Sequence, residues 1–321
     1  MNPDNCPMRT SFSRRRFLAS TTVAVATGCL LRDTSAAEPK EPIIDIHQHT
    51  HYHGRSDEQM IKHQRAMGIT TTILLPSGRP VKRPSTHDGR SNGLAARTGG
   101  NDTVLKIAKK FPKEYLFGAN EVPDLPDMQK ELEKFLKAGA VIIAEQKFKV
   151  ACDSKHVWAV AEVAQEFGVP VLMHFQHGSY NLNFDRFHRT LEKFPKVNFI
   201  GHAQTWWGNI DAKHDQKKMY PSGKVTPGGM TDKYLKNYPN MFGDLSAGSG
   251  LNALIRDEAH TKEFFERHQN QLFYGSDCAD TIGRGPGCQG SRTLAAVRRN
   301  SKNKTIERKL LYANSKKLFK L

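Results

Sequence analysis

The feature that most constrains this chain is a repeated alternation of short apolar runs with longer amphipathic stretches, which begins after Pro42. Short apolar runs bounded by turn residues predict buried strands, and apolar residues at helical spacing predict helices. The expected strands are Ile43–His47, Thr70–Leu75, Tyr115–Ala119, Ala140–Ala144, Pro170–His174, Val197–Gly201, Met241–Leu245 and Gln271–Gly275. The expected helices between them include Asp102–Phe111, Met128–Ala138, Val157–Phe167 and Phe184–Phe194. This order predicts an α/β protein with a single (β/α)8 TIM barrel.

A doubly wound parallel sheet is the structural alternative, and the placement of polar residues separates the two folds. A doubly wound sheet gathers its site at one switch point, whereas the carboxyl ends of all barrel strands meet at one mouth. Here histidines and aspartates recur at strand ends along the whole chain. We therefore expect residues 38–321 to form one barrel domain with its site at the C-terminal mouth.

Residues 1–37 have the pattern of an export signal. Three arginines, Arg14–Arg16, precede Phe17, the uncharged run Ala19–Leu31 and the small residues Ser35–Ala37. This order is typical of a secretory signal, and the paired arginines resemble the twin-arginine type. We expect residues 1–37 to be cleaved and the protein to be exported, to the periplasm or beyond, with a lipid anchor at Cys29 as the alternative. No other apolar run is long enough to span a membrane.

The chain is basic, with 48 Lys and Arg against 32 Asp and Glu and a formal net charge of +16. Five basic and two acidic residues lie in residues 1–37, so the remainder carries +13. A basic protein can bind nucleic acid or an anionic surface. The basic residues are spread along the chain, however, and no nucleic-acid-binding module is recognisable. We expect no specific nucleic-acid partner, and a non-catalytic basic binding protein is the alternative from another class.

The first expected strand runs into an Asp45-Ile-His47-Gln-His49 sequence. Because strand side chains alternate, His47 and His49 lie on the same side, about 7 Å apart along the strand. Two imidazoles at a strand end can bind one divalent ion. Asp45 has the same parity and is expected to orient these imidazoles or a neighbour.

Three later strands end in the same kinds of side chain. Apolar runs lead directly to His174 and His202, and the last run leads through Gly-Ser to Asp277. Core histidines would lie inside such runs, not at their ends. We therefore predict that His47, His49, His174 and Asp277 bind a single metal, with His202 beside it as a ligand or an acid/base.

These residues resemble the amidohydrolase superfamily, through the Asp-x-His-x-His start, the strand-terminal histidines and Gly275-Ser-Asp277. More narrowly they are similar to its amidohydrolase-related branch, which contains metal-dependent hydrolases and non-oxidative aromatic decarboxylases. The segment Leu311–Phe319 is similar to that branch's closing helix. The resemblance covers residues 43–321 and implies a TIM barrel with a metal at its mouth.

The resemblance also implies roles for single residues. His47, His49 and His174 match metal ligands of the first and fifth strands, and His202 matches the histidine of the sixth. Asp277 matches the last-strand aspartate, a ligand that also accepts a proton from the metal-activated water.

The fourth strand is where superfamily members with two metals carry a carboxylated lysine or a glutamate. Here Glu145 and Lys147 have the same parity, so either faces the mouth, or both lie in a solvated loop. We expect one ion, with Glu145 as an additional ligand. The imidazole-rich set favours Zn²⁺, with Mn²⁺ or Fe²⁺ as alternatives.

The resemblance implies hydrolysis of a small lactone, amide or ester, because hydrolysis is the commoner chemistry of the superfamily. A divalent ion would lower the pKa of bound water from about 15.7 to about 7 and supply the attacking hydroxide. Asp277 and His202 are the predicted catalytic residues. Non-oxidative decarboxylation of an aromatic or unsaturated acid is the alternative. The sequence leaves the oligomeric state open, a homo-oligomer included.

The substrate is expected to be a small anionic or aromatic molecule. Lys147 and Lys149 offer cations near the mouth. Trp206 and Trp207 follow His202 closely and either form an aromatic platform for the substrate or pack on the barrel rim. Cys278, next to Asp277, is interpreted as a packing residue.

Overall fold

The computed structural model describes residues 41–87 and 97–321. The predicted export signal, residues 1–37, and the alternative anchor Cys29 lie outside the described residues. Within the described part of the chain, no helix is both long enough and apolar enough to cross a membrane.

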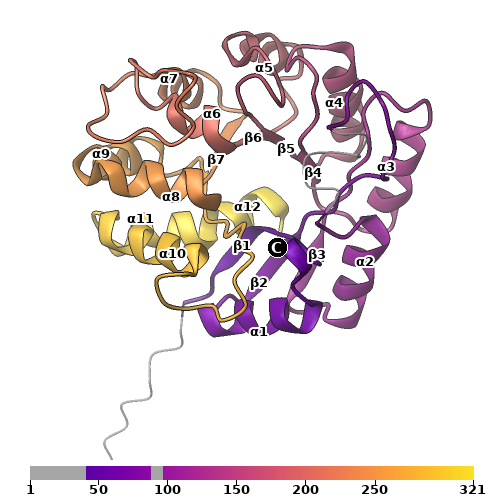
Figure 1. The fold of residues 1–321 in the computed structure, drawn as a ribbon, viewed down its shortest axis with the longest axis horizontal. Coiled ribbons are helices and arrows are strands. Elements are labelled where there is room, and N and C mark those ends of the chain that lie inside the picture. The colour runs from indigo at the N-terminus through magenta and orange to yellow at the C-terminus, as the bar shows by residue number, and fades with distance from the viewer. Residues whose placement is uncertain (1–40, 88–96) are drawn as a thin grey trace, which may run out of the picture. The chain divides into compact units, whose positions relative to one another are not determined.

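Eight parallel strands form the core of the molecule and helices lie outside them (Figure 1). The strands are β1 (Ile44–Gln48), β2 (Thr71–Leu74), β3 (Tyr115–Phe117), β4 (Ile143–Gln146), β5 (Val171–His174), β6 (Phe199–His202), β7 (Met241–Asp244) and β8 (Leu272–Phe273). Hydrogen-bonded neighbours follow the order β1-β2-β3 and β4-β5-β6-β7-β8. All eight expected strands are present, which confirms the predicted α/β barrel.

Backbone hydrogen bonds close the two sheets into a barrel. Ala119 pairs with Ile143 in a parallel bridge, which joins β3 to β4. The Ile46 amide donates to the Tyr274 carbonyl at 3.1 Å and the Asp277 amide donates to the His47 carbonyl at 2.8 Å, which joins β8 to β1. No edge is left unpaired between these strands, as closure requires.

The outer layer consists of helices that alternate with the strands. They are α1 (Asp57–Met67), α2 (Asn101–Lys110), α3 (Met128–Lys137), α4 (Lys155–Phe167), α5 (His188–Lys193), α6 (Ala203–Gly208), α7 (Met230–Asn237), α8 (Ala247–Arg256), α9 (Glu258–His268), α10 (Gln289–Asn300), α11 (Lys304–Arg308) and α12 (Asn314–Phe319). Short 3-10 turns occur at Tyr52–Gly54 and Phe184–Arg186, and a π-helical turn at Lys309–Ala313 joins α11 to α12.

Local sequence explains where the helices begin and end. At α1, Ser56 accepts a hydrogen bond from the Gln59 amide and the Gln59 side chain bonds back, forming a capping box. Gly68 ends α1 in the left-handed conformation (φ 78°), which glycine adopts without a steric penalty. α4 has the same plan, with Ser154 at its start and Gly168 at its end.

Apolar side chains fill the inside of the barrel. The interior cluster comprises Ile44, Ile46, Ile73, Leu75, Ile142, Ala144, Leu172, Ile200, Phe273 and Phe319. Phe319 belongs to α12, which therefore covers the end of the barrel opposite the strand carboxyl ends. A larger apolar cluster lies between the strands and the outer helices.

Two strands depart from regular pairing. Register shifts occur in β1 between Asp45 and Gln48 and in β4 between Ile143 and Gln146. The expected strand Ala140–Ala144 lies three residues too early, because β4 continues through Glu145 to Gln146, which pairs with Met173. Irregular pairing of this kind re-aims side chains near barrel rims.

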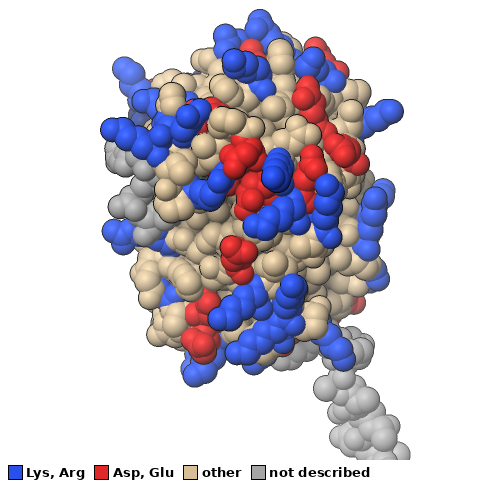
Figure 2. Space-filling model, turned by 90° about the vertical axis from the view of Figure 1, so that its right-hand side faces the viewer, with Lys and Arg blue, Asp and Glu red and all other residues tan. Residues whose placement is uncertain are grey.

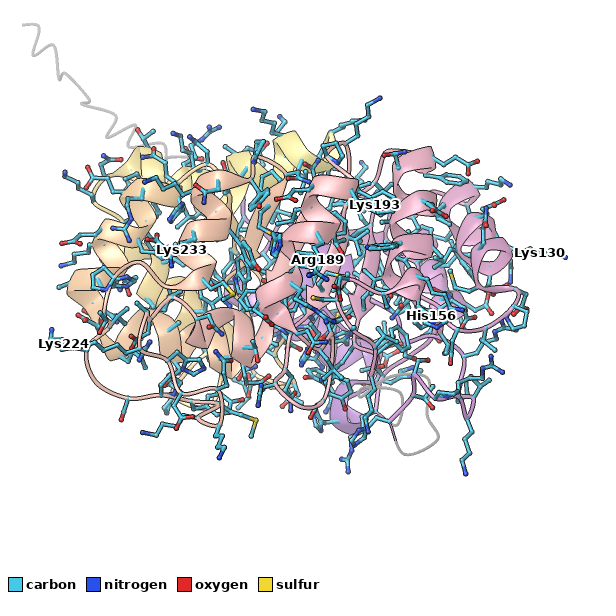
Figure 3. The ribbon with its side chains drawn as sticks, turned by 90° about the horizontal axis from the view of Figure 1, so that it is seen from above. Lys130, His156, Arg189, Lys193, Lys224 and Lys233 are labelled. Atoms are coloured by element: carbon cyan, nitrogen blue, oxygen red, sulfur yellow. The ribbon has the colours of Figure 1, made fainter. Side chains whose placement is uncertain are left out.

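Charged side chains cover the outer helices without forming one basic surface. On the face shown in Figure 2, Asp and Glu lie among the Lys and Arg. The labelled basic residues of Figure 3 are spread over α3, α4, α5, α7 and the loop that carries Lys224, with Arg189 and Lys193 both on α5. Several are paired: Arg189 lies 3.1 Å from Asp153 and Lys224 lies 3.2 Å from Asp257. Over these regions the positive charge is dispersed, as expected for a solvated surface.

Candidate metal centre

Six strand ends bring ionisable side chains together at the barrel mouth. We call these seven residues the mouth cluster: His47 and His49 from β1, Glu145 from β4, His174 from β5, His202 from β6, Asp244 from β7 and Asp277 beyond β8. Each is at most 7% exposed. Burying so many ionisable groups is costly unless they compensate one another or bind an ion.

Donor atoms of this cluster lie together in two overlapping groups, one of His47, His49 and Asp277 and one of His47, Glu145 and His202. Nε2 of His47 and Nε2 of His49 are 3.1 Å apart. Oε2 of Glu145 lies 3.5 and 3.4 Å from these nitrogens, and Oδ1 of Asp277 lies 3.9 and 3.5 Å from them. Tetrahedral Zn²⁺ with bonds of about 2.1 Å requires donor separations of about 3.4 Å. The separations within His47, His49 and Asp277 fit one metal ion, and Glu145 lies at similar distances from both imidazoles.

Hydrogen bonding shows which atoms of this group are left without a partner in the protein. Oε2 of Glu145 and Oδ1 of Asp277 are buried and accept no hydrogen bond. Nδ1 of His47 faces Asp244 at 2.7 Å and Nδ1 of His49 faces the Leu75 carbonyl at 2.8 Å, so both Nδ1 atoms donate. With both Nδ1 atoms held by acceptors, the Nε2 atoms are the ones left to face each other, and they are the nitrogens through which both rings could bind an ion.

Asp244 belongs to the mouth cluster, and the sequence analysis missed it. Its Oδ2 lies 2.7 Å from Nδ1 of His47 and 3.0 Å from Nδ1 of His202, and it accepts a 2.6 Å hydrogen bond from Ser246. One carboxylate thus orients two imidazoles, as carboxylates behind metal-binding histidines do. The sequence does carry a signal for Asp244. The run Met241-Phe-Gly leads to a carboxylate at a strand end, as the run before Asp277 does.

His174 lies beside the four donors. Its Nδ1 hydrogen-bonds Oε1 of Glu145, and its Nε2 lies 3.2 Å from Oε1 of Gln176. Burial and the nearby Lys147 lower the pKa of His174 to about 3, so the ring is neutral. In this geometry His174 holds Glu145, whereas the sequence analysis expected it to contact the metal.

Glu145, expected either as an additional ligand or in a solvated loop, is 1% exposed and points into the cluster. The solvated-loop interpretation of Glu145 is therefore wrong. Its neighbour Ala144 also faces the barrel interior, so the regular alternation of β4 breaks at this point. Lys147 lies at the rim and lines the cavity above the cluster.

The charges of the cluster are coupled. Burial would raise the pKa of Glu145, but His174 and Lys147 hold it well below its usual value. Burial likewise opposes ionisation of Asp244 and Asp277, and neighbouring histidines lower the pKa of both. The three carboxyl groups are therefore ionised. So much buried negative charge favours a bound cation.

Asp45 has a different role from the one expected. Its Oδ1 accepts hydrogen bonds from the backbone amides of His47, at 3.0 Å, and Ser276, at 2.9 Å. Its Oδ2 accepts from Gln64 of α1 at 2.7 Å. Asp45 therefore orients the backbone of β1 and of the segment after β8, and contacts neither imidazole ring.

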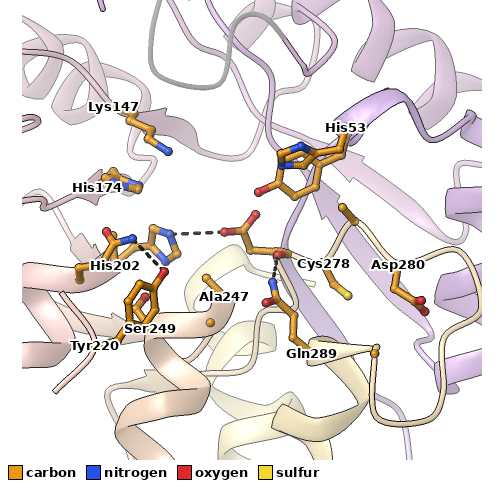
Figure 4. A pocket seen from close by; sticks show the side chains of 17 residues that line it. His53, Lys147, His174, His202, Tyr220, Ala247, Ser249, Cys278, Asp280 and Gln289 are labelled. Carbon is orange, nitrogen blue, oxygen red and sulfur yellow. Dashed lines mark hydrogen bonds and ion pairs between the residues drawn. The ribbon is translucent and has the colours of Figure 1, made fainter. Parts of the chain in front are cut away.

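A cavity of about 430 Å³ opens above the cluster (Figure 4). His174, His202 and Asp277 form part of its wall, together with the polar side chains of Lys147 and Gln289. The phenol of Tyr52 also lines it, and burial together with Asp277 raises the pKa of Tyr52 well above the ordinary value. Tyr52 thus stays protonated beside Asp277, a position for which the sequence offered no signal.

Trp206 and Trp207 do not form a substrate platform. They lie in α6 with exposures of 0% and 2% and belong to the apolar layer around the barrel. Nε1 of Trp207 donates to the Asp244 carbonyl at 2.9 Å. The packing interpretation is therefore the correct one, because the short helix after β6 turns both rings away from the cavity.

No protein-family model and no curated protein matches this sequence. Solved structures do match. An uncharacterised TIM-barrel protein from Bordetella bronchiseptica is 13% identical with a TM-score of 0.59, over 87% of this chain and 98% of that chain. A Pseudomonas putida protein assigned as a 2-pyrone-4,6-dicarboxylic acid hydrolase is 16% identical with a TM-score of 0.56, over 88% and 98%.

A third solved structure carries a ligand. It is a 5-carboxyvanillate decarboxylase from Novosphingobium aromaticivorans, complexed with manganese and 4-hydroxy-3-methoxy-5-nitrobenzoic acid. It is 16% identical with a TM-score of 0.52, over 82% of this chain and 80% of that chain. At these identities the likeness concerns the backbone alone. The chain is a (β/α)8 TIM barrel with a buried cluster of histidines and carboxylates at its mouth.

Proposed function

We propose that the protein is a metal-dependent hydrolase of the amidohydrolase superfamily, acting on a small lactone, amide or ester. The observation that carries this proposal is the set of four donor atoms on His47, His49, Glu145 and Asp277, two of which have no partner in the protein. Zn²⁺ is the preferred ion for this donor set, and Mn²⁺ or Fe²⁺ is the alternative.

A divalent ion in this position would polarise a carbonyl oxygen and lower the pKa of a bound water. The protein residues supply the proton transfers. Asp277 is ionised and lines the cavity, so its carboxylate accepts the proton of the attacking water. Nε2 of His202 lies 3.7 Å from Oδ2 of Asp277 and also lines the cavity, which places it to pass a proton to the leaving group.

The proposed substrate carries a negative charge. Lys147 lines the same cavity as Asp277 and His202, with its Nζ 5.4 Å from the centroid of the Tyr180 ring. An ammonium group at the rim of a water-accessible cavity attracts a carboxylate and orients the attached carbonyl compound. Gln289 and Ser249 add neutral hydrogen-bonding groups to the opposite wall.

Non-oxidative decarboxylation is the second candidate, and Lys147 supports it as well. A lysine beside a metal centre would also hold the carboxylate of an aromatic acid, and one protein of similar fold is a decarboxylase that binds manganese and a nitrobenzoic acid. Hydrolysis remains the first candidate, and the ionised carboxylate of Asp277 in the cavity wall supports it as an acceptor for the proton of a water.

The experiment compares the purified protein with H49A and with H51A. His51 has the same side chain but is exposed and pairs with Asp57, so H51A is the matched control. The metal content per chain is measured in all three proteins. Metal that H49A loses and H51A keeps is the metal bound by the mouth cluster. We expect about one ion per chain. No difference between the two variants would refute the metal centre.

Substrate panels then separate the two reactions. Lactones, amides and esters are compared with hydroxylated aromatic acids, and released acid is measured apart from released carbon dioxide. Hydrolysis without carbon dioxide supports the first candidate. Carbon dioxide release that H49A abolishes would replace it with the second.

We further propose that the protein is exported, because residues 1–37 have the order of a twin-arginine-type signal. Expression of the full chain in a bacterium with a twin-arginine pathway tests this. A mature N-terminus near Glu38 in the periplasm is the expected result. A full-length product that stays in the cytoplasm would contradict it.

A further inference from the structure

A second group of metal-binding side chains lies outside the mouth cluster. It consists of His63 from α1, Cys278 from the segment after β8, and Cys288 just before α10, and we call it the thiol cluster. All three are buried, with exposures of 0%, 1% and 0%. The two sulfur atoms are 3.9 Å apart, and Sγ of Cys288 lies 3.4 Å from Nε2 of His63.

Hydrogen bonds determine which nitrogen of His63 faces the sulfurs. The Gln64 amide nitrogen donates to Asp45 at 2.7 Å and to Thr72 at 2.9 Å. Its amide oxygen is therefore an acceptor, and Nδ1 of His63 donates to it at 3.0 Å. Nε2 is therefore the nitrogen that faces Cys288 and through which the ring could bind an ion. A metal-binding histidine is oriented in this way, with its other nitrogen bonded to a fixed acceptor.

The separations match tetrahedral zinc coordination. Bonds of about 2.3 Å to sulfur and about 2.0 Å to nitrogen require a sulfur–sulfur distance of about 3.8 Å and a sulfur–nitrogen distance of about 3.5 Å. The observed values are 3.9 and 3.4 Å. A disulfide would require sulfurs about 2.05 Å apart. The two thiols thus stand at the spacing of metal ligands.

Asp280 supplies a fourth donor. Its Oδ2 lies 3.8 Å from Nε2 of His63. The same oxygen accepts hydrogen bonds from the amides of Ile282 and Gly283, which fix the carboxylate at this place. The donor atoms of His63, Cys278 and Cys288 lie together, and Asp280 beside them adds the carboxylate that a four-coordinate zinc site requires.

We propose that His63, Cys278, Cys288 and Asp280 bind a structural Zn²⁺ ion, distinct from the ion of the mouth cluster. Binding requires both thiols to lose their protons to solvent, and the ion compensates the two thiolate charges. The site connects α1 to the segment between β8 and α10. That segment also carries Asp277, so the ion fixes the loop on which the catalytic carboxylate lies.

The sequence analysis interpreted Cys278 as a packing residue, and its neighbours show more than packing. Arg55 donates to the carbonyls of Cys278 and Asp280, each at 2.8 Å, and Gln48 donates to the Cys278 carbonyl at 3.1 Å. The backbone around Cys278 is therefore held rigidly before any ion binds. In Figure 4 the Cys278 sulfur points away from His202, out of the mouth cluster.

The test uses the full chain loaded with Co²⁺, which replaces Zn²⁺ and absorbs strongly when bound to thiolate. C288S is compared with C152S, because Cys152 is equally buried but bonds to the Asn183 carbonyl, away from the cluster. We expect the thiolate-to-cobalt absorption in wild type and C152S, its loss in C288S, and about one Zn²⁺ fewer per chain in C288S.

Further measurements make the result decisive. H49A should keep the thiolate-to-cobalt absorption, so loss of the mouth metal and loss of the thiol metal are distinguishable. Absence of the absorption in wild type would overturn the proposal, and this measurement needs no variant to fold. Thiols are also counted in denaturant with a chelator. Two thiols fewer than expected would show that Cys278 and Cys288 form a disulfide, which would also overturn it.

Discussion

The mouth cluster and the thiol cluster meet at adjacent residues, yet they differ in chemistry. Asp277 belongs to the first and Cys278 to the second. The mouth cluster offers imidazoles and carboxylates and opens onto a cavity of about 430 Å³. The thiol cluster offers two sulfurs and one imidazole, with the Asp280 carboxylate beside them. Catalytic zinc sites keep an open position and structural sites are closed, and this difference is the basis for the proposed catalytic role of the mouth cluster and the proposed structural role of the thiol cluster.

The two clusters also orient their histidines differently. In the mouth cluster an ionised carboxylate, Asp244, faces Nδ1 of both His47 and His202. In the thiol cluster a neutral amide, Gln64, faces Nδ1 of His63. A carboxylate makes the imidazole more electron-donating than an amide does. The link between them is Asp45, which bonds both Gln64 and the His47 amide.

The largest expected effect is a difference in kcat between variants of two neighbouring residues, Asp277 and Cys278. D277N removes an ionised carboxylate from the mouth cluster, and we expect kcat to fall about 1000-fold, since metal activation contributes several kcal/mol. C278S should lower kcat less than about tenfold at a temperature where it is folded. The measurement is steady-state hydrolysis of the best substrate from the panel. Equal losses in the two variants would show that the clusters do not have separate roles.

The next effect concerns thermal stability. Removal of metal from the thiol cluster should lower the melting temperature by at least about 5 °C, because each kcal/mol shifts Tm by about 2–4 °C in a large domain. We therefore expect a chelator to lower the Tm of wild type by more than that of C288S, measured by calorimetry. An equal shift in both would mean that the thiol cluster contributes no metal-dependent stability.

A smaller effect is expected from the residue that orients the mouth histidines. D244N should weaken metal binding about 10- to 100-fold, since carboxylates behind metal-binding histidines contribute this much. D232N is the matched control, because Asp232 bonds His268 at 2.6 Å, away from the mouth cluster. Affinity is measured by competition with a chelator. Unchanged affinity in D244N would remove Asp244 from the proposed site.

The smallest effect concerns the substrate. K147M should raise KM for an anionic substrate about fivefold, since a partly exposed ion pair contributes up to about 1 kcal/mol. K149M is the control, because Lys149 lies two residues later and is exposed. A neutral substrate of the same shape should show no difference. Equal KM values for K147M and K149M would show that Lys147 does not bind the substrate charge.

Much of the fold follows from patterns within short segments. Apolar runs and helical spacing predicted all eight strands, and most bounds agree within one or two residues. β4 was placed too early because a glutamate and a glutamine occupy its last two positions, which a hydrophobic pattern does not recognise as strand. Those polar side chains are accepted there because Glu145 meets histidines and Gln146 meets Asn120.

The site was predicted less completely than the fold. His47, His49, His202 and Asp277 were predicted as site residues because they lie at the ends of expected strands. The structure brings them together. The same signal at Asp244 was overlooked. Tyr52 and His63 could not be found in this way, because neither ends a strand and their partners lie more than 200 residues away in the sequence.

The sequence by itself determined the order of strands and helices and the kinds of side chain at the strand ends, because both depend on neighbours within a few residues. The tertiary structure decided which way those side chains point. Regular alternation would turn Ile46 and His47 to opposite sides, but the register shift in β1 lets both face inward, and the shift in β4 does the same for Ala144 and Glu145. A register shift arises from pairing with another strand, so it is invisible in the strand's own sequence.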